Sequence, residues 1–137
     1  MGNEKWEMRI LVTGGLGFIG SNFILHILKN YPEIEIVNLD AGLTGSNTKN
    51  LAEIEKSSKY NFVSGNINDK SCVEKIIPDV DGVINFAAES HVDRSILDSK
   101  PFLESNIMGV YSLLDTIRDR KPEIKFLQIS TDEVFGS

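Results

Sequence analysis

Two periods of hydrophobic residues alternate along the chain and predict strands and helices in turn. Short β-branched and aliphatic runs bounded by turn residues are typical of buried strands. These runs are residues 9–13, 34–40, 60–64, 82–87 and 124–130. Apolar residues at helical spacing predict helices between them. The predicted helices are residues 18–30, 51–57, 71–77 and 102–120, with a predicted loop at residues 41–50.

The order of these elements predicts an α/β fold. Strands that alternate with helices form right-handed βαβ crossovers, which produce a parallel sheet with helices on both faces. A chain of 137 residues suits one domain with its own core. We therefore expect residues 1–137 to form a single α/β unit that ends after its fifth strand.

Composition narrows the class of protein further. The chain is 41% hydrophobic and 25% charged, close to globular averages, and it lacks the run of about 18 apolar residues that a membrane helix needs. Its net charge of −6 disfavours a nucleic-acid partner but permits a nucleotide bound through backbone amides. Residues 1–8 lack the apolar core of a secretory signal. We expect a cytoplasmic protein that binds neither membrane nor nucleic acid.

Cysteine and histidine offer little chemistry in this sequence. The single cysteine, Cys72, excludes an internal disulfide. It lies in a predicted helix without a histidine or lysine placed to activate it, so we interpret it as a structural thiol. The two histidines, His26 and His91, form no metal-binding cluster with it. We interpret His91, which is in a predicted loop, as structural, and we expect no metal site.

The last predicted helix combines an apolar stripe with a polar residue inside it. The stripe consists of Phe102, Leu103, Ile107, Val110, Leu113, Leu114 and Ile117. Asn106 falls within this arc at about 100° per residue, and a buried amide needs hydrogen-bond partners. Asn106 either ties backbone groups together at an irregular strand or shapes a functional site from behind. Met108 and Tyr111 project beyond the arc, which predicts contact with a partner subunit.

A glycine-rich loop joins the first strand to the first helix. Gly14, Gly15, Gly17 and Gly20 stand where a chain must turn tightly, admit a pyrophosphate and pack a helix on a strand. The amides and dipole of the following helix would face the phosphates. This strand-loop-helix unit predicts a Rossmann-type dinucleotide-binding fold.

An acidic residue at the end of the second strand predicts which dinucleotide binds. Asp40 follows Gly20 by 20 residues, where a carboxylate accepts hydrogen bonds from both ribose hydroxyls and repels a 2′-phosphate. The next residue is Ala41, not the arginine that favours NADP. The sequence therefore favours NAD, the alternative being that Asp40 is an ordinary solvated strand end.

Three segments resemble the dTDP-glucose 4,6-dehydratases, a family of extended short-chain dehydrogenases. Residues 87–95, AAESHVDRS, are similar to one signature of that family. Residues 130–137, STDEVFGS, resemble a second signature, with Phe135 in place of the usual tyrosine. Residues 13–20, TGGLGFIG, resemble the glycine loop of extended short-chain dehydrogenases generally. The resemblance runs from about Arg9 to the last residue.

The resemblance implies an NAD site. Phe18 and Ile19 would lie over the pyrophosphate, and Asp40 would hold the adenosine ribose. Asn66 stands where the family usually has aspartate beside the adenine, and its oxygen can still accept from an exocyclic amine. The implied cofactor-binding residues are Gly14, Gly17, Phe18, Ile19, Gly20, Asp40, Ala41, Gly42, Leu43, Asn66, Ile67, Phe86, Ala87, Ala88, Glu89, Ser90 and Ser105.

The resemblance also implies a reaction, the dehydration of dTDP-glucose to dTDP-4-keto-6-deoxyglucose. Hydride leaves C4 of the sugar, water leaves across C5 and C6, and the hydride returns to C6. Asp132 is the implied acid for the departing hydroxyl, and Glu133 is the implied base for the C5 proton. Thr131 would bind the C4 oxygen, and Ser90 would also touch the sugar. The family implies a homodimer.

Two other functions remain open from the sequence. One is an epimerase or decarboxylase of UDP-sugars, against which the Asp132–Glu133 pair argues, because simple epimerases need no elimination acid and base there. The other is a non-catalytic NAD-binding module.

Short-chain dehydrogenases also use a tyrosine with a lysine four residues later, in which the lysine lowers the tyrosine pKa. None of Tyr31, Tyr60 and Tyr111 begins such a pair. We therefore expect the C-terminal substrate-binding portion to be absent, the fifth strand to be an unprotected apolar edge, and the 137-residue chain to be inactive alone.

Overall fold

A five-stranded parallel sheet forms the centre of the computed structural model, which describes residues 7–43, 45–89 and 92–136. The strand order is β3-β2-β1-β4-β5, and all four pairings are parallel. The strands are β1 (Met8–Thr13), β2 (Ile34–Asp40), β3 (Tyr60–Ser64), β4 (Gly82–Asn85) and β5 (Lys125–Gln128). This order and the crossovers between strands confirm the predicted Rossmann-type α/β fold.

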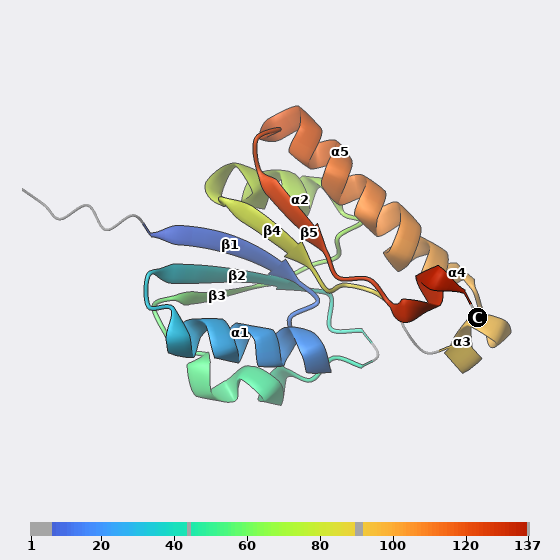
Figure 1. Ribbon diagram of the computed structural model, residues 1–137, viewed down its shortest axis with the longest axis horizontal. Coiled ribbons are helices and arrows are strands. Elements are labelled where there is room, and N and C mark those ends of the chain that lie inside the picture. Colours follow the sequence, from blue (N-terminus) through green and yellow to red (C-terminus); the bar gives the residue numbers. More distant parts are fainter. Residues whose placement is uncertain (1–6, 44, 90–91, 137) are drawn as a thin grey trace, which may run out of the picture.

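Helices cover the sheet on both faces (Figure 1). The helical segments are α1 (Phe18–Asn30), η1 (Thr48–Ile54), α2 (Lys70–Ile76), η2 (Ile77–Asp79), α3 (Val92–Leu97), α4 (Lys100–Leu103), η3 (Glu104–Gly109), α5 (Val110–Arg120) and η4 (Asp132–Phe135). In Figure 1, α1 lies on one side of the sheet and α2 and α5 lie on the other. None of the helices that the structure describes is long and apolar enough to cross a bilayer.

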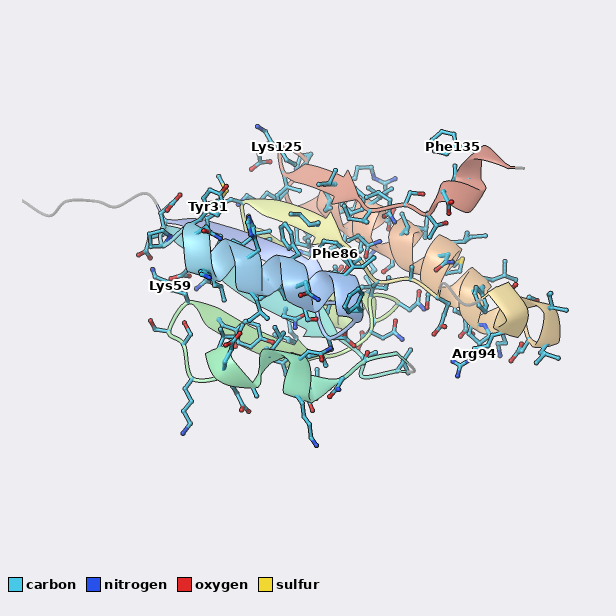
Figure 2. The ribbon with its side chains drawn as sticks, turned by 60° about the horizontal axis from the view of Figure 1, so that its bottom comes forward. Tyr31, Lys59, Phe86, Arg94, Lys125 and Phe135 are labelled. Carbon is cyan, nitrogen blue, oxygen red and sulfur yellow. The ribbon has the colours of Figure 1, made fainter. Side chains whose placement is uncertain are left out.

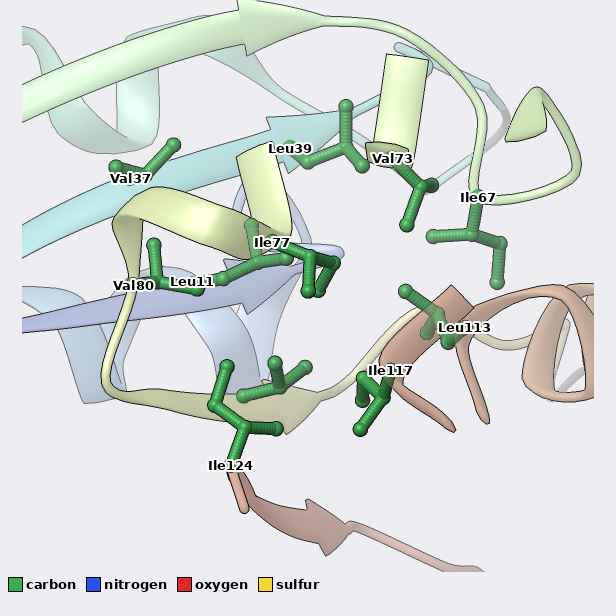
Figure 3. Close-up of a cluster of buried hydrophobic side chains, with 11 residues drawn as sticks. Leu11, Val37, Leu39, Ile67, Val73, Ile77, Val80, Leu113, Ile117 and Ile124 are labelled. Atoms are coloured by element: carbon green, nitrogen blue, oxygen red, sulfur yellow. The ribbon is translucent and has the colours of Figure 1, made fainter. Parts of the chain in front are cut away.

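Side chains of the central strands alternate between two cores, because successive strand residues point to opposite faces. Ile10 and Val12 of β1 pack with Ile24 of α1 on one face. Leu11, between them, packs with Val73 of α2 and with α5 on the other face. Figure 3 shows this second cluster, which includes Leu113 and Ile117 of α5. A strand that is buried on both faces reads as a continuous apolar run, which is why β1 could be predicted.

The predicted boundaries are accurate near the N-terminus and less so toward the C-terminus. The structure confirms the helix at residues 18–30 and the strands at residues 34–40 and 60–64. β4 and β5 are shorter than predicted. The predicted helix at 51–57 is a 3₁₀ helix that begins at Thr48, since the Asn47 side chain accepts a hydrogen bond from the Lys49 amide at 3.0 Å. Helix α3 was not predicted from the sequence.

The long predicted helix contains a π-helical segment and begins earlier than expected. α4, η3 and α5 follow one another without a break from Lys100 to Arg120. Only part of the predicted stripe is buried: Leu113 and Ile117 are in the core, whereas Leu103 and Ile107 are 52% and 58% exposed. The prediction of one continuous buried arc was therefore wrong, because only the α5 half of this stretch packs on the sheet.

Candidate dinucleotide-binding site

The glycine loop lies directly against the segment that follows β4. Gly14 has φ of +70°, a conformation that residues with a Cβ rarely adopt. A Cβ atom on Gly14 would lie 2.6 Å from the Ala87 nitrogen and 2.8 Å from the Ala87 Cα. Only glycine therefore lets the ends of β1 and β4 approach each other this closely.

The N-terminus of α1 is open to a ligand. Gly17 caps the helix without a side-chain hydrogen bond, and its first turn contains no acidic residue. Among the described residues, the backbone amides of Phe18, Ile19 and Gly20 have no hydrogen-bond partner. Three free amides and the positive end of the helix dipole form a site that suits a phosphate group.

Phe18 and Ile19 extend from this terminus into solvent, where their side chains are 80% and 63% exposed. Large apolar side chains at this exposure are available to cover a bound group. Gly20 is buried, and a Cβ there would overlap the Gly14 carbonyl oxygen. The loop thus presents backbone and apolar surface rather than charge, which is consistent with a pyrophosphate site built on amides.

Asp40 holds the glycine loop to the loop after β2. Its side chain is largely buried, and Oδ2 accepts a hydrogen bond from the Leu16 amide at 2.9 Å. Oδ1 accepts from the Gly42 amide at 2.8 Å and from the Ser46 hydroxyl at 3.0 Å. A carboxylate has about four acceptor positions, so these three donors leave room for a further hydroxyl. Asp40 is thus an organised strand end and not a freely solvated one.

Asn38 is a supporting residue that was not predicted from the sequence. It is fully buried in β2, where Oδ1 accepts from the Gly15 amide at 3.1 Å and Nδ2 donates to the Tyr60 hydroxyl at 2.9 Å. A Cβ on Gly15 would overlap this Oδ1 atom. Burial, and less strongly the charge of Asp40, raises the pKa of the Tyr60 phenol. A polar residue inside an otherwise apolar strand was the sequence feature that could have indicated this role for Asn38.

A second buried polar group, also missed, links the carboxyl ends of β1, β4 and β5. The Thr13 hydroxyl donates to Asn85 Oδ1, and Asn85 Nδ2 donates to Gln128 Oε1 at 2.8 Å. Thr13, Asn85 and Gln128 occupy matching positions in the sheet register. Thr13 and Asn85 are fully buried. Each ends an apolar strand, so strand-end polar residues could have indicated this group.

The segment after β4 contains several predicted cofactor-binding residues. The ring of Phe86, labelled in Figure 2, belongs to this segment. It packs on Phe23 of α1 at a centroid distance of 5.2 Å. Ala87 is half-buried and Ala88 is exposed. Ser90 and His91 lie outside the described residues.

Asn106 is exposed rather than buried as its position in the apolar arc predicted. Its amide pairs with both backbone groups of Glu89: Oδ1 accepts from the Glu89 amide at 2.9 Å and Nδ2 donates to the Glu89 carbonyl at 3.0 Å. It therefore does tie backbone groups together, in the segment just beyond β4. Ser105, beside it, is half-buried.

The remaining predicted cofactor residues lie on loops at the same edge of the sheet. Ala41, Gly42 and Leu43 form an exposed loop after β2. Asn66 Oδ1 accepts from the Asn68 amide at 2.9 Å, which stabilises the turn after β3. Ile67 is 5% exposed and belongs to the core, so only its backbone can face a ligand.

The predicted catalytic residues follow β5. Thr131 and Asp132 are exposed, and within the described part of the chain neither side chain makes a hydrogen bond or ion pair. Glu133 lies in η4, and its side chain is outside the described atoms. Cys72 is elsewhere, within α2, where burial raises the pKa of its thiol and so disfavours the reactive thiolate.

The sheet order, the open α1 terminus and the Asp40 carboxylate place this chain in the class of Rossmann-type domains. Within that class, it belongs to the GDP-mannose 4,6 dehydratase family, whose model matches residues 11–137.

Individual relatives agree with this assignment. The chain is 46% identical over 129 residues to the low-salt glycan biosynthesis protein Agl12 of Haloferax volcanii, covering 94% of this chain and 41% of the relative. It is 42% identical over 139 residues to the dTDP-glucose 4,6-dehydratase of Salmonella typhimurium, covering 94% of this chain and 38% of that one. The chain therefore spans about two fifths of the length of these relatives.

A solved structure shows the same arrangement. The dTDP-glucose 4,6-dehydratase DesIV from Streptomyces venezuelae, crystallised with NAD bound, superposes with a TM-score of 0.89 at 41% identity. The match covers 95% of this chain and 41% of that one.

Proposed function

We propose that this chain provides the NAD-binding part of a nucleotide-sugar 4,6-dehydratase that converts dTDP-glucose to dTDP-4-keto-6-deoxyglucose. The observation that carries the proposal is the open N-terminus of α1 beside the buried Asp40 carboxylate. Free amides suit a pyrophosphate, and an anchored carboxylate suits a ribose. The 42% identity to a dTDP-glucose 4,6-dehydratase and the NAD bound in DesIV support this choice of chemistry.

Asp40 would select NAD over NADP. Its negative charge would face the ribose 2′ position, where a phosphate would be repelled. Its three internal hydrogen bonds hold it in place, so it cannot turn away without freeing the Leu16 and Gly42 amides. Gly14, Gly17 and Gly20 would let the pyrophosphate reach the backbone.

The segment after β5 would supply the acid and base of the elimination. Bound NAD would provide the hydride acceptor for C4 and the hydride donor for C6. Thr131 would bind the C4 oxygen, Glu133 would remove the C5 proton and Asp132 would protonate the departing C6 hydroxyl. An exposed Asp132 after β5 suits a side chain that must reach an incoming sugar. This adjacent pair favours a dehydratase over an epimerase or a binding module.

Titration calorimetry with NAD and NADP tests the cofactor assignment. We expect the chain to bind NAD more tightly than NADP. Equal or reversed affinities would contradict the role given to Asp40. A chain that binds neither dinucleotide would contradict the proposed function as a whole.

The same proposal includes a cytoplasmic homodimer. Met108 and Tyr111 are 52% and 60% exposed on adjoining turns of η3 and α5, and apolar surface of this kind is typical of subunit contacts. Sedimentation of the double variant Met108→Glu, Tyr111→Glu checks the assignment. We expect the wild-type chain to sediment as a dimer and the variant as a monomer; a monomeric wild type would show that this helix is not an interface.

The proposal also covers the tyrosine and lysine pair that short-chain dehydrogenases use as the base for hydride transfer. Neither Tyr31, Tyr60 nor Tyr111 has a lysine four residues later. We propose that the base for hydride transfer comes from the portion of the relatives that this chain does not match. Adding dTDP-glucose and NAD to a chain of verified 137-residue mass should therefore produce no keto-sugar, and turnover would overturn this assignment.

A further inference from the structure

The π-helical segment η3 contacts two loops at the edge of the sheet where the dinucleotide would bind. π-helical turns are rare and often occur at functional sites. In η3, the Asn106 side chain pairs with both backbone groups of Glu89, at 2.9 and 3.0 Å. The two residues are 17 positions apart, and the two bonds fix the peptide groups on both sides of Glu89 in the manner of a strand pairing. A local turn therefore does not account for this contact.

The end of the same segment packs against the loop after β3. Gly109 is buried, and a Cβ at this position would overlap Cδ1 of Ile67. Gly109 therefore allows η3 to lie close to the loop that carries Asn66 and Ile67. One helical segment thus sets the position of the loop after β3 and of the segment after β4.

The segment after β4 is held from its other side by the glycine loop. The Ala87 amide donates to the Thr13 hydroxyl at 3.4 Å, and Gly14 lies against the Ala87 backbone. Residues 86–89 are therefore fixed near one end by β1 and at Glu89 by Asn106. Without Asn106, the described contacts would hold only the end nearest the sheet.

The sheet order shows which part of a dinucleotide this segment would meet. In a Rossmann-type sheet, the ligand crosses the point where the strand order reverses, here between β1 and β4. Asp40, on β2, lies on the adenosine side of the glycine loop. The second nucleoside therefore lies on the β4 side, over residues 86–89.

We propose that Asn106 is a positioning residue for the second nucleoside of the dinucleotide. It acts through the Glu89 backbone, which it holds in the position that the bound nucleoside requires. This inference rests on the proposed NAD site and goes beyond it, because Asn106 need not touch the cofactor itself.

The experiment compares Asn106→Ala with wild type, using NAD and ADP as probes. ADP carries the adenosine and pyrophosphate but lacks the second nucleoside. We expect NAD affinity to fall roughly 3–10-fold, in line with the loss of one or two hydrogen bonds, and ADP affinity to stay within about twofold. Glu104→Ala is the matched control: Glu104 lies in the same π-helical segment and is exposed, and among the described residues its side chain makes only a 3.8 Å ion pair with Lys100.

Amide hydrogen exchange at Glu89 provides a readout that does not depend on a ligand. Protection reflects hydrogen bonding and local opening, so exchange at Glu89 should accelerate in Asn106→Ala and stay unchanged in Glu104→Ala. Asn106→Asp keeps the size of the side chain and the acceptor for the Glu89 amide but loses the donor. It serves as the second variant if Asn106→Ala does not fold.

The outcomes separate the inference from the proposed function. If wild type binds neither NAD nor ADP, the NAD site fails, and with it this inference. If wild type binds both and Asn106→Ala binds NAD equally well, only the positioning role fails. An equal loss of NAD and ADP affinity would also overturn it, because that result indicates a general structural role.

Discussion

The loops after β1 and β2 differ sharply from the segment after β5. The first two are held by fully or largely buried polar side chains: Asn38 binds the Gly15 amide and Asp40 binds the Leu16 amide. After β5, Thr131 and Asp132 are exposed, and Phe135 is 91% exposed at the far end of the chain (Figure 2). The two loops and the segment after β5 all lie at the carboxyl ends of strands in one sheet. Only the loops after β1 and β2 are organised by contacts within the described chain.

This difference shows how the two halves of the proposed site depend on their surroundings. The dinucleotide side is preorganised, because buried side chains fix each loop before a ligand arrives. The side that carries the predicted acid and base has no comparable support among the described residues. The β5 edge beside it exposes Leu127 (53%), which lines an apolar groove of about 590 Å³ with Ile84 and Ile129. The region after β4 lies between these extremes, held by Thr13 and Asn106.

The largest expected effect is at Gly14. Replacing it with alanine strains a backbone at φ +70° and places a Cβ 2.6 Å from the Ala87 nitrogen. We expect Gly14→Ala to lower the free energy of unfolding by about 2–4 kcal/mol. Urea unfolding measures it. Gly45→Ala, at φ +92° with open space around the added atom, should cost only about 1 kcal/mol. Equal losses would show that the loop does not press on the segment after β4.

A substitution at Asn85 tests whether the buried group of Thr13, Asn85 and Gln128 links the end of β1 to the end of β5. Asn85→Ala leaves the Thr13 hydroxyl without its acceptor and the Gln128 side-chain oxygen Oε1 without its donor, which should lower the free energy of unfolding by about 1–3 kcal/mol. Asn61→Ala is the control, since Asn61 is an exposed strand asparagine in the same sheet. The change at Asn61 should be within about 0.5 kcal/mol, measured by the same urea unfolding. A neutral Asn85→Ala would mean that the strand ends are independent.

A substitution at Asp40 tests whether the organised loops after β1 and β2 bind the dinucleotide. Asp40→Ala removes the proposed ribose acceptor and frees the Leu16 and Gly42 amides, so NAD binding should weaken by roughly 1–3 kcal/mol. Asp79→Ala removes the same charge at an exposed position in η2 and should leave NAD affinity unchanged. Calorimetric titration compares the two. If both variants lose affinity equally, net charge rather than the Asp40 contact governs binding.

The smallest expected effect is at the segment after β5. The double variant Thr131→Val, Asp132→Asn changes two exposed side chains that make no described hydrogen bond, so the free energy of unfolding should change by less than about 0.5 kcal/mol. Thermal and urea unfolding measure it. A loss of 2 kcal/mol or more, on the order of a core substitution, would show that this segment is anchored after all and would remove the contrast with the glycine loop.

Residue patterns predicted much of the fold and the dinucleotide half of the candidate site. The apolar runs of β1 and β2 predicted central strands, because both faces of a parallel sheet are buried. The spacing from Gly20 to Asp40 predicted the dinucleotide edge. The supporting roles of Asn38 and Asn85 were not predicted, since each acts on a backbone group that is distant in sequence.

Local sequence determined the elements that depend on near neighbours. Helix α1 begins and ends as predicted because its glycines, apolar spacing and the proline at position 32 act within a few residues. Tertiary structure alone decided which face of the helix from Lys100 to Arg120 is buried and where Asn106 points. Helical periodicity defines an apolar arc but does not say how far the sheet extends beneath it. The sheet covers only the α5 half, which leaves Asn106 exposed and within reach of Glu89.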